Sequence, residues 1–145
     1  MSQDRSLQSQ AAEAAARKKR RLRIIVADDE RDQVMTLAAI LQDEGHEVRE
    51  VYLGAEVLRM VREFDPDVAL IDIGMPGMSG YDVAREVRAE FGKRPLLIAV
   101  TGWKQSSDRI LARLAGFDHH VAKPFESKTI LELITPFVEG SGALR

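Results

Sequence analysis

The chain contains no cysteine among its 145 residues, so disulfide bonds, thiolate metal sites and cysteine nucleophiles are excluded. This absence is compatible with a reducing cytosol, and we expect a cytoplasmic location. No uninterrupted apolar run exceeds five residues, as in Leu96 to Val100, which is too short to span a membrane. The polar N-terminus also lacks the apolar segment of a signal peptide.

Acidic and basic residues are unevenly distributed. Residues 1–23 carry seven Lys and Arg against two acidic residues, a charge of +5, whereas the remainder carries fourteen against twenty-one, a charge of −7. We expect residues 1–21 to form a mobile or weakly helical basic arm, with nucleic-acid or membrane-surface binding as the alternative. Residues 22–139 would then form one domain, and residues 140–145 a frayed tail.

Short apolar runs alternate with segments of helical periodicity from Leu22 onward. Strands are expected at residues 22–27, 47–51, 68–72, 96–100 and 119–122. Helices follow each strand, and Ile110, Leu111 and Leu114 mark the apolar, core-facing stripe of the fourth. His46, in the turn before the second strand, is expected to be solvated. Five alternations with short links predict an α/β fold, a doubly wound five-stranded parallel sheet with five helices and the flavodoxin-like order 2-1-3-4-5.

Polar residues follow the expected strands where each one ends. Asp28 and Asp29 follow the first strand, and Asp72 ends the third. Thr101 and Lys123 follow the fourth and fifth strands. Because ligands bind beyond the carboxyl ends of parallel strands, near the switch point between strands one and three, we expect these side chains to share one site. Taken alone, the segment 68–80 fits two interpretations equally well. One is a ligand site at Asp72, and the other is only a buried strand with a polar end followed by a tight turn.

Three carboxylates gathered in one place repel one another, and one lysine cannot neutralise them. Mg²⁺ takes oxygen ligands and would neutralise the three carboxylates. The backbone carbonyl of Gly74 would be a further ligand. An aspartate can act as a nucleophile toward phosphorus, while Mg²⁺, an ammonium and a hydroxyl neutralise the phosphoryl oxygens. Asp72 with Asp28 and Asp29 as the carboxylates, Lys123 as the ammonium and Thr101 as the hydroxyl supplies every group that this chemistry needs.

Four motifs occur in a fixed order along the chain: DD at 28–29, the apolar strand ending in Asp72 with GMPGMSG at 74–80, VTGW at 100–103 and VAKPF at 121–125. Together they resemble the receiver domain of two-component response regulators, a CheY-like fold, over residues 22–138. The resemblance implies that Asp72 accepts a phosphoryl group from a phosphohistidine on a histidine kinase or histidine phosphotransfer protein. It implies direct Mg²⁺ binding by Asp29 and binding through water by Asp28.

Some positions depart from the usual pattern of that family. His120 occupies the aromatic switch position, three residues before Lys123, so coupling through it could depend on pH. The alternative is that His120 is only a partly exposed strand residue. At the two positions that tune phosphoryl lifetime, Gly74 leaves the site open and Trp103 could shield it from water. The resemblance also implies a cis Lys123–Pro124 bond.

Phosphorylation would draw Thr101 and Lys123 toward Asp72 and shift the fourth helix, fifth strand and fifth helix. Only twenty residues follow Phe125, so no DNA-binding domain is expected, and the output would be a downstream protein partner or a dimer through that surface. The chain would be a stand-alone receiver or one cut from a hybrid kinase. It would not be an enzyme beyond its own phosphorylation and slow dephosphorylation. A phosphorylation-independent interaction module and a Mg²⁺-dependent phosphohydrolase stay open as alternatives.

Overall fold

The computed structural model describes residues 20–102 and 106–139, apart from the side chains of residues 106–108. Most of the expected basic arm, residues 1–19, lies outside these ranges. The expected tail at 140–145 and the proposed shielding residue Trp103 also lie outside them.

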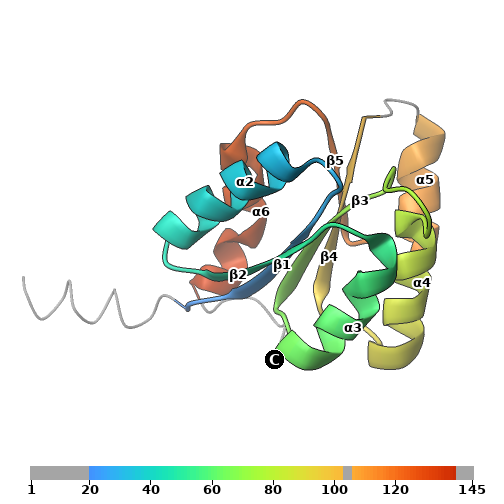
Figure 1. Ribbon diagram of the computed structural model, residues 1–145, viewed down its shortest axis with the longest axis horizontal. Coiled ribbons are helices and arrows are strands. Elements are labelled where there is room, and N and C mark those ends of the chain that lie inside the picture. The colour runs from blue at the N-terminus through green and yellow to red at the C-terminus, as the bar shows by residue number, and fades with distance from the viewer. Residues whose placement is uncertain (1–19, 103–105, 140–145) are drawn as a thin grey trace, which may run out of the picture.

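Five parallel strands form one sheet in the order β2-β1-β3-β4-β5 (Figure 1). The strands are β1 (Arg23–Ala27), β2 (Glu47–Val51), β3 (Val68–Asp72), β4 (Leu96–Thr101) and β5 (His119–Ala122). Each begins and ends within one residue of the sequence expectation. Every residue of β3 and β4 is buried, as expected for continuous apolar runs covered on both faces.

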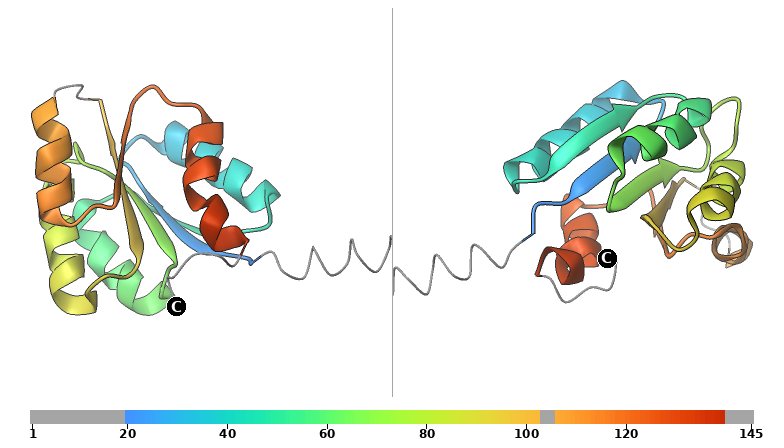
Figure 2. Two further views of the ribbon diagram at one scale, coloured as in Figure 1. Left: turned by 180° about the vertical axis from the view of Figure 1, so that it is seen from behind. Right: turned by 90° about the horizontal axis from the view of Figure 1, so that it is seen from below.

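The described residues contain five helices, labelled as in Figure 1 from α2 onward. They are α2 (Arg31–Asp43), α3 (Gly54–Phe64), α4 (Gly80–Phe91), α5 (Ser106–Ala115) and α6 (Ser127–Val138). Helices α2 and α6 cover one face of the sheet, and α3, α4 and α5 cover the other (Figures 1 and 2). In β1, Ile24 and Val26 pack toward the first pair while Ile25 and Ala27 pack toward the other three. The predicted fold class is confirmed.

Helix α5 does not bury the face that its apolar residues predicted. Ile110, Leu111 and Leu114 are 62%, 44% and 76% exposed, whereas Ala112 and Ala115 are buried in the core. The expectation that the large residues form the core stripe is therefore wrong. Alanine side chains bring the helix close to its neighbours, and the larger residues are left on the outside.

His46 is buried rather than solvated, with only 5% of its surface exposed. Helix α2 ends at Asp43, and Gly45, at φ +96°, reverses the chain. The backbone N–H of His46 then donates to the carbonyl of Leu41 at 3.1 Å. This tight turn brings the imidazole next to β1, where its Nδ1 accepts a hydrogen bond from the N–H of Leu22 at 3.1 Å.

Strand β2 lies at one edge of the sheet, and its surface is largely charged. Arg49 and Glu50 are exposed, and Glu47 is half-buried. Across the described ranges, none of the helices has the length and apolar character needed to cross a membrane.

Candidate functional site

The acidic residues of the two central strands meet at the carboxyl edge of the sheet. Asp28 follows β1, where its N–H donates to the carbonyl of Val51 at 3.0 Å. Asp72 ends the adjacent strand β3. One carboxylate oxygen from each of Asp28, Asp29 and Asp72 lies within 4.8 Å of the others. The predicted clustering of these three residues is thus present.

Lys123 connects two of these carboxylates. Its Nζ donates to Oδ2 of Asp28 at 2.8 Å and to Oδ2 of Asp72 at 3.1 Å. The side chain is only 17% exposed, so these pairs are partly shielded from water. Burial alone would lower the pKa of Lys123, but its hydrogen bonds to Asp28 and Asp72 outweigh burial and raise that pKa above its ordinary value.

The two buried carboxyl groups have pKa values that move in opposite directions. Burial and then the negative charge of Asp28 raise the pKa of Asp72, against the hydrogen bonds from Lys123 and from the N–H of Gly74 at 2.9 Å. Burial acts the same way on Asp28, but hydrogen bonds from Lys123 and from the N–H of Glu30 at 3.0 Å lower its pKa overall. The more strongly stabilised anion is therefore Asp28.

The site fits a hard divalent cation. Among the described residues, its three clustered carboxylates face one ammonium group, which leaves an excess of negative charge. Carboxylate oxygens are the ligands that Mg²⁺ prefers, and the exposed side chain of Asp29 is open to solvent. Gly74 contacts Asp72 through its N–H, so a role for its carbonyl as a ligand stays a prediction.

Thr101 ends β4 at the same edge of the sheet and is 1% exposed. The pairing of Asp72 with Val100 sets Thr101 one residue beyond the end of β3. The N–H of Lys123 donates to the carbonyl of Thr101 at 2.7 Å, which joins the ends of β4 and β5. The Lys123–Pro124 bond is cis, as the family resemblance implied.

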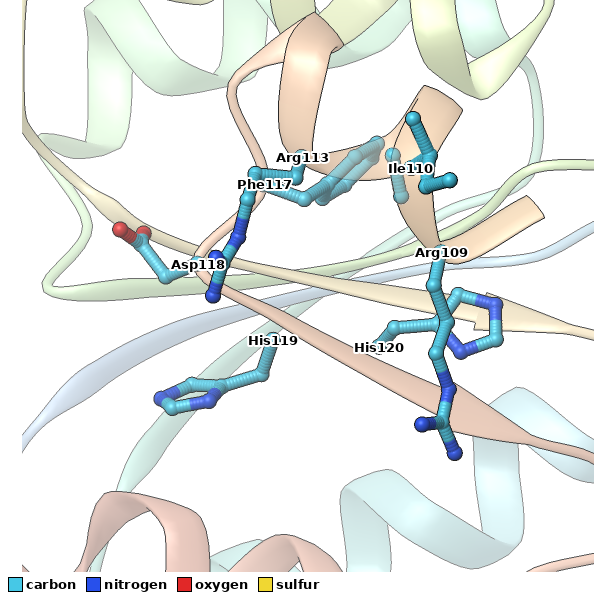
Figure 3. A pocket seen from close by; sticks show the side chains of 8 residues that line it. Arg109, Ile110, Arg113, Phe117, Asp118, His119 and His120 are labelled. Carbon is cyan, nitrogen blue, oxygen red and sulfur yellow. The ribbon is translucent and has the colours of Figure 1, made fainter. Parts of the chain in front are cut away.

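His120 lies on β5, paired with Ala99 of β4, and is half-buried. It lines a groove of about 420 Å³ between β5 and α5. Figure 3 shows Arg109 and Arg113 reaching from α5 toward this strand. A switch role for His120 stays a prediction.

Sequence reasoning missed two features near these residues. One is the groove between β5 and α5, because the sequence pattern predicted that Ile110, which lines this groove, would be buried in the core. The spacing of the buried residues Ala112 and Ala115 is the signal that could have revealed it. The other is the turn between β2 and α3, where Gly54 is buried against the loop that follows Asp72.

The chain has an open α/β sheet, with a carboxylate cluster and a lysine at the point where the strand order reverses. Proteins of this class bind a charged ligand beyond the carboxyl ends of their strands. Residues 24–135 match the family model described as the response regulator receiver domain. The chain belongs to this family, the receiver domains of two-component systems, which are signalling modules.

Relatives and solved structures agree with this assignment. The chain is 32% identical to protein PilH of Pseudomonas aeruginosa over 120 residues, covering 81% of this chain and 98% of PilH. It is 35% identical to the DNA-binding response regulator MtrA of Mycolicibacterium smegmatis over 111 residues, which cover 77% of this chain and 48% of MtrA. It therefore spans about half the length of MtrA. A CheY-like receiver domain protein from Methanospirillum hungatei superposes with a TM-score of 0.76 at 25% identity, covering 84% of this chain and 97% of that one.

Proposed function

We propose that this chain is a phosphoacceptor in a two-component phosphorelay, and that Asp72 takes a phosphoryl group from a phosphohistidine on a histidine kinase or phosphotransfer protein. The observation that carries this proposal is the Lys123 ammonium held between Asp28 and Asp72, with the third carboxylate of Asp29 beside them. The domain would comprise residues 22–139, in a cytoplasmic protein.

In the transfer, a carboxylate oxygen of Asp72 bonds to phosphorus while the bond from phosphorus to the donor imidazole breaks. The electron pair of that bond stays on the imidazole nitrogen, which then takes a proton from solvent. Lys123 and the hydroxyl of Thr101 stabilise the phosphoryl oxygens from the ends of β5 and β4. Asp28, Asp29, Asp72 and the carbonyl of Gly74 would hold Mg²⁺, which would supply further positive charge.

The signal would leave through the surface formed by α5, β5 and α6. Phosphorylation converts the anionic carboxylate of Asp72 into an acyl phosphate that carries about two negative charges, which favours a packing in which Thr101 and Lys123 lie closer to it. The exposed apolar residues of α5 supply a surface for a downstream protein or for a second copy of the chain. His120, which lines the groove beside α5, would couple this surface to the site.

The test is intact-mass measurement after incubation with Mg²⁺ and a small acyl phosphate. Wild type is expected to gain one phosphoryl group, and Asp72→Asn none. Asp43→Asn, at the exposed C-terminal end of α2, is the matched control and should react as wild type does. Absence of any adduct on wild type would favour a phosphorylation-independent interaction module. Continuous turnover of unrelated phosphate esters would indicate a phosphohydrolase.

A further inference from the structure

The turn between β2 and α3, residues 52–54, contacts elements on both sides of the site. On one side, the guanidinium carbon of Arg31 lies 4.2 Å from the centre of the Tyr52 ring. Arg31 is the first residue of α2 and stands two positions after Asp29. The turn is thereby joined to the loop that carries Asp28 and Asp29.

On the other side, Gly54 packs against the loop that follows Asp72. A methyl group at Gly54 would overlap the carbonyl oxygen of Met78 and would lie 3.4 Å from its Cβ. Gly54 is buried at the first position of α3, so the helix cannot turn this position toward solvent. The backbone of Met78 therefore rests directly on the backbone of α3.

The loop from Ile73 to Ser79 is also held at its two ends. The N–H of Ile73 donates to the carbonyl of Val100 at 3.0 Å, and the N–H of Gly80 donates to the carbonyl of Ile73 at 3.2 Å. Met75 is buried in the core. The contact between Gly54 and Met78 holds the loop between these two ends, in the same segment as the exposed residues Gly74 and Gly77.

Topology explains why this turn reaches both loops. Strand β2 pairs with β1, and β1 pairs with β3. The connection from β2 to β3 must therefore pass β1, and α3 begins where that passage starts. A turn in this position contacts the loops that follow β1 and β3, the two strands whose ends carry the carboxylates.

We infer that Gly54 and Tyr52 are positioning residues, which set the spacing between the Asp28–Asp29 loop and the Gly74 loop and so tune the affinity of the site for Mg²⁺. The inference rests on the proposed function, because it assumes that the two loops bind one cation together. Ligands must be held within about 0.5 Å of their productive positions, so a small displacement of the Met78 backbone weakens binding.

The first test compares Gly54→Ala with Gly45→Ala by Mg²⁺ titration calorimetry and urea unfolding. Gly45 has φ +96° and open space around its Cβ position, and it lies in the turn between α2 and β2, away from the site. Both variants should lose stability. Gly54→Ala should also bind Mg²⁺ about tenfold more weakly, as for other residues that orient metal ligands, whereas Gly45→Ala should keep wild-type affinity.

The second test addresses the other contact and does not depend on the folding of Gly54→Ala. Tyr52→Leu removes the ring under Arg31, whereas Tyr52→Phe keeps the ring and removes only the hydrogen bond from its hydroxyl to Glu50. Tyr52→Leu should weaken Mg²⁺ binding, and Tyr52→Phe should not. Wild-type affinity in both Gly54→Ala and Tyr52→Leu would overturn the inference and leave the proposed function intact. A wild-type chain that binds no Mg²⁺ would overturn both.

Discussion

At the scale of single residues, the imidazole of His46 is a buried acceptor. Its Nδ1 receives the N–H of Leu22, so the ring is neutral and carries its proton on Nε2. Burial lowers the pKa of His46, and the nearby charge of Arg21 adds to this, against the opposing charges of Glu44 and Asp67. If the ring of His46 were protonated, its Nδ1–H would face the N–H of Leu22, and the hydrogen bond between them would be lost.

This arrangement predicts a loss of stability in mild acid. The ordinary histidine pKa of about 6.5 applies to the unfolded chain, which therefore binds more protons than the folded chain just below that pH. The contribution of His46 is complete above the unfolded pKa, and it decreases as the pH falls from there through the lower pKa of the folded state.

The variant His46→Asn isolates this effect, because its side-chain oxygen can accept the same hydrogen bond without titrating. Urea unfolding at neutral and mildly acidic pH should show a smaller loss of unfolding free energy in the variant than in wild type. Equal losses in the two proteins would mean that His46 does not titrate on unfolding in this range.

At the scale of elements, the orientation of α5 implies that two leucines contribute very differently to the free energy of unfolding. Leu114 lies on its exposed face, whereas Leu97 of β4 is fully buried. Leu97→Ala should cost about 2–5 kcal/mol of unfolding free energy. Leu114→Ala should change it by no more than about 0.5 kcal/mol, as measured by urea unfolding. A large cost at Leu114 would show that this face is covered in solution.

The strands were predictable because their apolar runs are short and end in turn residues, as β3 does at Asp72. The acidic site followed from parallel topology, since strand ends at one edge bring Asp28 and Asp72 together. The orientation of α5 was predicted wrongly, because its larger apolar residues outweighed the weaker signal of Ala112 and Ala115, and periodicity does not reveal on which side of a helix the sheet lies. The packing of Gly54 against Met78 joins segments distant in sequence, and the pattern of neither segment indicates it.

At the scale of the whole molecule, the excess negative charge at the site couples metal binding to folding. A cation that binds the folded chain alone stabilises it by about 2.7 kcal/mol at a concentration one hundred times its Kd. Addition of Mg²⁺ should therefore raise the unfolding free energy of wild type, and EDTA should reverse the gain. Asp29→Asn should lose most of this gain, since it removes a charged ligand without touching the core. An equal gain in wild type and Asp29→Asn would contradict the assigned metal site.

The charged character of β2 also matters for how the protein behaves at high concentration. An unpaired sheet edge is a template on which a strand from another molecule can form β-structure, the first step of aggregation. A strand added there would lie beside Glu47, Arg49 and Glu50, whose desolvation opposes growth. We therefore expect the side chains that make β2 a weak contributor to the core to oppose fibril formation as well.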